Sequence, residues 1–217
     1  MKQGLKAVDF TLFRIIPLVF LLFVLYADVR TSFEAFNRIN NYSFYSFLES
    51  FSAILCFVIL GFLSVLKSFK KTKKFSLYCR YGAGVMALIY IVLSLLERIQ
   101  SLWLLRSLEY TPETSVFSDC FSMLSLQKTL YIIAFLTVIM NSVLNDKFFK
   151  VKQILTIVCT VSFFGANFCN PLYTLIRYNG TVSFRFLFNS SLYSYSFCAV
   201  ILTGLFPTKA AIEVPQS

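Results

Sequence analysis

The chain has 217 residues, of which 58% are hydrophobic and only 14% are charged, and its formal net charge is +10. Soluble domains average about 45–50% apolar and about 25% charged residues, so this composition leaves too little polar surface for a water-soluble globule. It predicts a membrane protein. The basic residues lie between apolar runs rather than along one face or tail, which excludes nucleic acid as the partner that the net charge would suggest.

Apolar runs long enough to cross a bilayer recur along the chain, and a transmembrane helix needs about 20 mostly apolar residues. No small-residue cleavage site follows the first run, so we interpret it as a retained span and not as a signal peptide. We therefore predict an all-α polytopic bundle, with one transmembrane domain over residues 1–217. Its spans, about six in number, are 10–27, 45–66, 81–105, 130–144, 154–176 and 190–206.

The distribution of basic residues predicts the orientation of this bundle. If the N-terminus is cytoplasmic, six crossings return the C-terminus to the cytoplasm, and most of the 20 Lys and Arg residues then lie on the cytoplasmic side. This asymmetry follows the positive-inside rule. The loop after the second span contributes most to it and also suits contact with the anionic lipids of the bilayer. Its lysines are Lys67, Lys70, Lys71, Lys73 and Lys74.

Three Asn-x-Ser/Thr sequons fall on the predicted outer side, at Asn41, Asn179 and Asn189. A eukaryotic glycosylation enzyme would reach them there, so the sequence favours a glycoprotein of the endoplasmic reticulum or another endomembrane. The plasma membrane is the alternative. Sequons also arise by chance in a chain this rich in Ser and Thr, and Asn189 lies close to the bilayer.

The sequence contains no histidine, and its six cysteines form no C-x-x-C pair. Histidine is the commonest general base and a usual zinc ligand, so we predict no metal site, no cofactor and no enzymatic activity. No phosphate-binding glycine motif is present in the sequence either. Cys120 and Cys169 both fall on the predicted outer side, where a disulfide is one possibility and unmodified thiols are the other.

Polar residues inside the spans are the strongest functional signal, because such groups are costly in the bilayer and usually face the interior of a bundle. Glu97 lies roughly 24 Å along the third span and Asn167 roughly 20 Å along the fifth, at about 1.5 Å per residue. Asn170 lies one turn beyond Asn167, and Glu49 lies one turn inside the second span. We predict that these four side chains converge on a polar pocket in the outer leaflet.

Arg98 or Arg106 would supply the counter-charge of this pocket. Pro171 is predicted to break the fifth helix, which would free backbone carbonyl groups to line the pocket. Asn141 lies near the opposite end of the fourth span, too far away to join the pocket. Its amide is predicted to hydrogen-bond a neighbouring helix.

An alternative interpretation removes Glu97 from the membrane. If the third helix ends at Leu96, residues 97–110 form an interfacial amphipathic helix anchored by Trp103. Glu97 would then be an ordinary residue at the level of the lipid headgroups.

Two classes of function follow from these patterns. The absence of catalytic motifs and of an extramembrane domain favours a non-enzymatic accessory, assembly or trafficking protein, whose partners are other membrane proteins. The predicted pocket favours the alternative, a small transporter or channel subunit.

Overall fold

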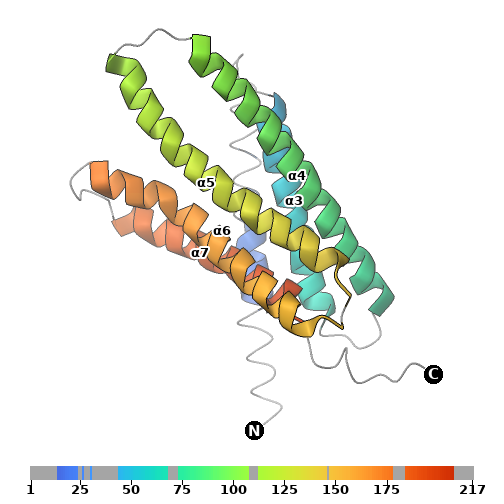
Figure 1. Ribbon diagram of the computed structural model, residues 1–217. Coiled ribbons are helices and arrows are strands. Elements are labelled where there is room, and N and C mark those ends of the chain that lie inside the picture. The colour runs from blue at the N-terminus through green and yellow to red at the C-terminus, as the bar shows by residue number, and fades with distance from the viewer. Residues whose placement is uncertain are drawn as a thin grey trace.

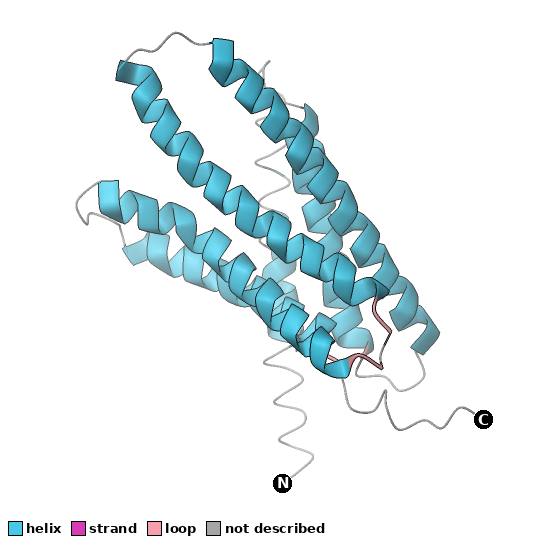
Figure 2. Cartoon of the chain, viewed as in Figure 1, coloured by secondary structure: helices cyan, strands magenta, loops and turns pink. Residues whose placement is uncertain are grey.

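A computed structural model of the chain describes residues 14–23, 26, 30, 44–67, 73–107, 112–145, 147–177 and 184–207. These residues form helices joined by turns, and none of them lies in a β-strand (Figure 2). The prediction of an all-α fold is confirmed for this part of the chain. Its helices are a segment at 14–23, α3 (Phe44–Leu66), α4 (Lys73–Ser107), α5 (Pro112–Val143), α6 (Phe149–Arg177) and α7 (Phe184–Leu205).

Within the described residues, four helices are long and apolar enough to cross a membrane. Twenty residues of α-helix extend about 30 Å, which matches the hydrocarbon core of a bilayer. A shorter apolar stretch, Ser194–Leu205, lies in α7. The four spanning stretches are Phe47–Leu66 in α3, Lys74–Gln100 in α4, Ser125–Val143 in α5 and Phe149–Cys169 in α6.

The five labelled helices form a closed ring. Each packs against the next along the chain from α3 to α6, α6 packs against α7, and α7 returns to α3 (Figure 1). The contact that closes the ring is very close, because a Cβ atom added to Gly204 of α7 would lie 2.8 Å from the Leu60 carbonyl oxygen of α3. On the same two helices, Ser64 Oγ donates a hydrogen bond of 2.6 Å to Thr203 Oγ1. Small residues and hydroxyl groups are the usual means of close helix packing in membranes.

An aromatic layer fills the centre of the ring, and each labelled helix contributes one ring to it. Phe57 of α3 makes edge contacts with Phe135, Phe163 and Phe197, at centroid distances of 5.8, 4.8 and 4.4 Å. Tyr90 of α4 completes the layer, with its ring centroid 4.1 Å from that of Phe135. All five side chains are buried. Aromatic pairs at such distances stabilise a core beyond the area that they bury.

The predicted bounds agree with α3, whereas the other four labelled helices begin earlier than predicted. They start at Lys73, Pro112, Phe149 and Phe184 instead of residues 81, 130, 154 and 190. Residues 112–129, expected to belong to a loop, are the first part of α5. A helix that projects beyond the hydrocarbon core need not be apolar, so hydropathy underestimates its length. The predicted break near Asn170–Pro171 is wrong, because α6 continues to Arg177. Proline is tolerated within membrane helices where neighbouring groups satisfy the carbonyl that it leaves without a donor.

A tight turn joins α5 to α6 and makes them antiparallel neighbours. The Asn145 carbonyl oxygen accepts a hydrogen bond of 3.1 Å from the Phe148 N–H. Its side-chain Oδ1 accepts a second one, of 3.4 Å, from the Lys147 N–H. Asparagine favours such turns because its side chain can bond the backbone two residues further on.

Candidate functional site

Three charged side chains from three helices meet inside the bundle: Glu49 of α3, Glu97 of α4 and Lys128 of α5. The Lys128 ammonium contacts Glu97 Oε2 and lies 3.4 Å from Glu49 Oε2. The side chains of Glu49, Glu97 and Lys128 are 7%, 19% and 29% exposed, respectively. We refer to these three residues as the Glu97 cluster. Together they carry a formal charge of −1.

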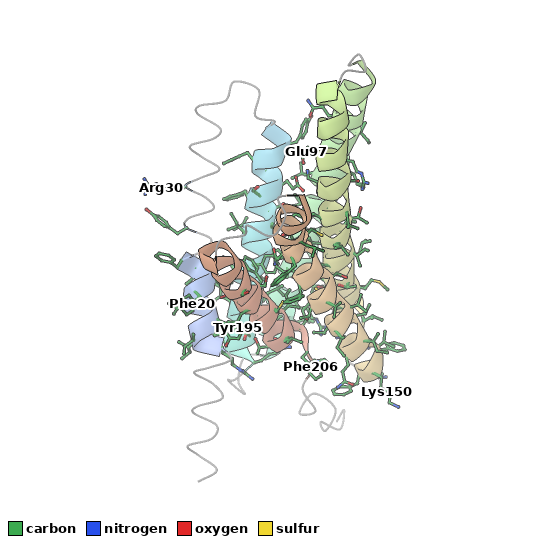
Figure 3. The ribbon with its side chains drawn as sticks, turned by 90° about the vertical axis from the view of Figure 1, so that its left-hand side faces the viewer. Phe20, Arg30, Glu97, Lys150, Tyr195 and Phe206 are labelled. Atoms are coloured by element: carbon green, nitrogen blue, oxygen red, sulfur yellow. The ribbon has the colours of Figure 1, made fainter. Side chains whose placement is uncertain are left out.

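The Glu97 cluster lies at a consistent depth in the predicted membrane. Each of its residues is within three positions of the end of an apolar stretch, those of α3, α4 and α5. That distance is about one helical turn, or roughly 5 Å. Glu97 lies toward one end of the bundle, and Lys150 and Phe206 lie toward the other (Figure 3). We refer to these as the Glu97 end and the Lys150 end.

Helical periodicity explains why Glu97 faces inward. Tyr90, Ser94 and Glu97 follow one another at spacings of four and three residues, so they share one face of α4. Because Tyr90 belongs to the aromatic layer at the centre of the ring, Ser94 and Glu97 on the same face also point toward the centre. The side chains of Tyr90 and Ser94 both lie next to the Glu49 carboxyl group. The Glu97 cluster therefore rests directly on the aromatic layer.

Ser94 is the most deeply buried polar residue beside the cluster. Its relative exposure is 0%, and its Oγ atom interacts with the Glu49 carboxyl group and the Tyr90 hydroxyl group without making a hydrogen bond of normal geometry within the described part of the chain. A buried hydroxyl group in this state recovers only part of the hydrogen bonding that it loses to water.

The counter-charge differs from the one that the sequence suggested. Arg98 does not bind the carboxylates: its guanidinium donates to Ser125 Oγ and, at 3.2 Å, to Thr129 Oγ1. It thereby joins α4 to α5. Lys128 supplies the counter-charge instead. This role was not predicted for Lys128, because the fourth span was predicted to begin at residue 130. One signal was available, since Lys128 lies seven residues before Phe135 and therefore on the same face of α5.

Asn167 lies close to the same region through a contact with α5. The Tyr131 hydroxyl group donates a hydrogen bond of 2.6 Å to Asn167 Oδ1. The other side of this amide, Nδ2, is buried without a partner among the described residues. Asn170 belongs to α6, but its side chain lies outside the described residues, as does that of Arg106. Of the four predicted pocket residues, the structure thus joins Glu49 and Glu97 directly and connects Asn167 to α5.

The helix end at Leu96, on which the alternative interpretation of Glu97 rested, is wrong, whereas the level of Glu97 relative to the lipid headgroups stays a prediction. α4 continues without interruption to Ser107, and Glu97 lies within its apolar stretch. A single turn of polar residues does not end a helix, because Glu, Arg and Gln are all good helix formers.

A second polar group, the Asn141 cluster, lies toward the Lys150 end. Asn141 Nδ2 donates hydrogen bonds to Thr156 Oγ1 at 3.0 Å and to the Lys152 carbonyl oxygen at 3.2 Å. Thr156 Oγ1 in turn donates to the same carbonyl oxygen at 2.7 Å. All three residues are at most 1% exposed. The prediction that Asn141 bonds a neighbouring helix is confirmed.

Basic side chains gather near the Lys150 end. Lys67 Nζ donates a hydrogen bond of 2.9 Å to the Phe206 carbonyl oxygen, and Arg14 Nη1 donates one of 3.0 Å to the Ser64 carbonyl oxygen. Lys147 and Lys150 are exposed. Lys70 and Lys71 of the predicted lipid-binding loop lie outside the described residues, and so does the Lys73 side chain, so anionic-lipid contact stays a prediction.

The modification sites stay predictions as well. Asn41 and Asn179 lie outside the described residues, and so do the side chains of Asn189 in α7 and Cys120 in α5. Cys169 is buried in α6. Among the residues that the structure describes, no three His, Cys, Asp or Glu side chains gather into a possible metal site.

Comparison of the chain with protein-family models, with curated proteins and with solved structures gives no match. The arrangement of the two polar clusters around the aromatic layer is therefore the basis for assigning a function.

Proposed function

We propose that the chain is a small membrane transport protein, without enzymatic activity, whose solute-binding site is the Glu97 cluster. The observation that supports this most strongly is the meeting of charges from α3, α4 and α5 one turn inside their apolar stretches. Ionisable groups at that depth are costly, and in membrane proteins they commonly mark a solute or ion path. A purely structural contact between these helices would be made more cheaply by apolar packing.

The aromatic layer provides the barrier that such a path needs. Phe135 lies between Lys128 and Asn141 along α5, and its ring packs against that of Tyr90, so this part of the layer separates the Glu97 cluster from the Asn141 cluster. A solute bound at the cluster would cross when the rings of this layer change rotamer and the helices around them shift. Transporters commonly hold the solute within the membrane and move their gates around it.

For the topology, we propose six spans with both termini in the cytoplasm and the Glu97 end facing the lumen or the exterior. The described helices and the basic residues at the Lys150 end support this orientation. Glycans at Asn41, Asn179 or Asn189 of an endomembrane protein would agree with it. An engineered sequon within residues 68–72 should stay unmodified in cells, and a glycosidase-sensitive mass shift there would contradict the orientation.

The transport proposal is tested in proteoliposomes that contain the purified protein. Uptake of radiolabelled sodium, rubidium and methylammonium is compared with that of empty vesicles. At least one of these ions should enter faster with the wild type, and Glu97→Gln should reduce the rate to that of empty vesicles. Asn141→Ala is the matched control, because it removes a buried polar side chain remote from the cluster. Uptake by Glu97→Gln at the wild-type rate would contradict the proposal.

A second proposal, an accessory or assembly role, is favoured by the length of α5. Residues 112–124 precede its apolar stretch and extend the helix by about 20 Å beyond it. Such a projection offers a surface to another membrane protein. Purification in mild detergent with quantitative mass spectrometry tests this role: a partner near one-to-one stoichiometry supports it, and a protein that purifies alone contradicts it.

A further inference from the structure

We propose that the Glu97 cluster binds the primary ammonium group of a small organic amine between the Glu49 carboxylate and the Ser94 hydroxyl group. Lys128 competes with this amine for Glu49. The inference rests on the proposed transport function and names the class of its solute.

The site already holds one ammonium group, that of Lys128. Lys128 Nζ contacts Glu97 closely but lies 3.4 Å from Glu49 Oε2, at the outer limit of a hydrogen bond. Of the two carboxylates, Glu49 is also the more buried, with a side-chain exposure of 7%. Its charge is thus largely removed from water while its bond to Lys128 is weak. A second ammonium group at Glu49 would supply the strong, charge-assisted bond that is missing there.

Ser94 places a hydroxyl group beside the Glu49 carboxyl group. Its oxygen is fully buried, interacts with the Glu49 carboxyl group and makes no hydrogen bond of normal geometry within the described residues. An ammonium ion has three N–H donors and no acceptor. A ligand nitrogen between these two residues would satisfy both the carboxylate and the serine oxygen. The Tyr90 hydroxyl group also interacts with the Glu49 carboxyl group and adds another oxygen to the same place.

The number of oxygen ligands favours an amine over a divalent metal ion. Calcium takes about six to eight oxygen ligands and magnesium about six in near-octahedral order. The described part of the site offers two carboxylates, both already in contact with Lys128, and the hydroxyl groups of Ser94 and Tyr90 beside Glu49. These few oxygen atoms match the three N–H donors of an alkylammonium ion better than the ligand number of either metal.

Glu97 is the positioning residue in this arrangement. Its close contact with Lys128 holds the tethered ammonium away from Glu49. When Glu97 is neutral, Lys128 should move onto Glu49 and exclude the ligand. When Lys128 is absent, Glu49 should be open at all times. The two changes therefore act on ligand affinity in opposite directions, which a merely structural ion pair would not do.

The experiment is calorimetric titration of the detergent-purified, full-length protein with n-butylammonium chloride. Tetramethylammonium, which has no N–H donor, and n-butanol, which has no charge, are the control ligands. The wild type should bind n-butylammonium at one saturable site and neither control. Glu49→Gln should weaken binding at least tenfold. Lys128→Met should tighten it about tenfold, if Lys128 leaves Glu49 open roughly a tenth of the time.

Two variants protect this test against loss of folding. Ser94→Ala removes a single oxygen atom that makes no hydrogen bond of normal geometry among the described residues, and it should weaken binding about fivefold, the equivalent of one hydrogen bond. Lys150→Met, on an exposed lysine at the other end, should leave binding unchanged. Absence of n-butylammonium binding to the wild type, equal binding of tetramethylammonium, or unchanged affinity in Ser94→Ala would each overturn the proposal.

The outcomes also separate this inference from the transport function. If sodium or rubidium enters proteoliposomes in a Glu97-dependent manner while n-butylammonium does not bind, the amine is wrong and transport stands. If n-butylammonium binds with the predicted pattern of variants but methylammonium uptake equals that of empty vesicles, the site stands and the transport function is wrong.

Discussion

The Glu97 cluster and the Asn141 cluster lie at similar depths from opposite ends of the apolar stretches, yet they are built differently. In the Asn141 cluster, an amide and a hydroxyl group bond one another and a backbone carbonyl, and all three residues are at most 1% exposed. In the Glu97 cluster, the Glu97 carboxylate and the Lys128 ammonium remain partly exposed, and the adjacent Ser94 oxygen makes no hydrogen bond of normal geometry among the described residues. A satisfied neutral network holds helices together, whereas a charged cluster with incomplete bonding is a site at which a ligand improves the bonding.

The largest loss of stability is expected when the Glu97 cluster loses its positive charge. Lys128→Met leaves Glu49 and Glu97 next to each other without their shared ammonium, and it should lower the free energy of unfolding by about 3 kcal/mol. Adding n-butylammonium should restore part of this loss. The measurement is denaturant unfolding in mixed micelles, with Lys150→Met as the control. Equal stability of the two variants would show that the cluster carries no buried charge.

A smaller loss of stability is expected when a glycine is enlarged where α4 and α5 approach each other beside the Asn141 cluster. A Cβ atom on Gly84 would lie 2.9 Å from Ser142 Cβ, so Gly84→Ala forces two helices apart. It should destabilise the protein by about 2 kcal/mol. At Gly82 the nearest atom, Ile59 Cδ1, would be 3.7 Å away, and Gly82→Ala should be neutral or slightly stabilising. If the two variants unfold at the same denaturant concentration, this close approach does not contribute to stability.

Asn141→Ala tests whether the two clusters are independent of each other. It removes two hydrogen bonds between α5 and α6 and should cost about 1 kcal/mol, the usual range for such bonds within membranes. Its affinity for n-butylammonium should equal that of the wild type. A large loss of affinity would mean that the two clusters act as one unit.

The smallest effect is expected for Tyr131→Phe, which removes the single oxygen that bonds Asn167 Oδ1. The variant should be about 0.5 kcal/mol less stable in the same unfolding assay, since a neutral hydrogen bond contributes roughly that much. An increase in stability would show that the bond is not formed in the membrane-like environment.

Much of the fold was predictable from the sequence because membrane helices follow from local composition. The apolar run of α3 ends at Lys67, and the predicted bounds of 45–66 nearly equal Phe44–Leu66. The start of α5 was not predictable in this way, because residues 112–124 lie outside its apolar stretch and form a helix without being apolar. The continuity of α6 through Pro171 depends on its neighbours and not on its own sequence.

The site was only partly predictable for a related reason. Glu49 and Glu97 attract attention as isolated acids within apolar runs, and helical rise places them at one depth. The sequence places Lys128 in a loop before the fourth span and offers Arg98 or Arg106 as the counter-charge. Which of these cations reaches the carboxylates depends on how α4 and α5 rotate about their axes, and that rotation is fixed by the aromatic layer through Tyr90 and Phe135.

The most direct test of the difference between the two clusters is methylammonium uptake into proteoliposomes by three proteins: wild type, Glu97→Gln and Asn141→Ala. We predict equal initial rates for the wild type and Asn141→Ala, and the rate of empty vesicles for Glu97→Gln. Wild-type uptake by Glu97→Gln, with folding verified by its elution as a single species in detergent, would show that the charged cluster is structural and that the solute path lies elsewhere.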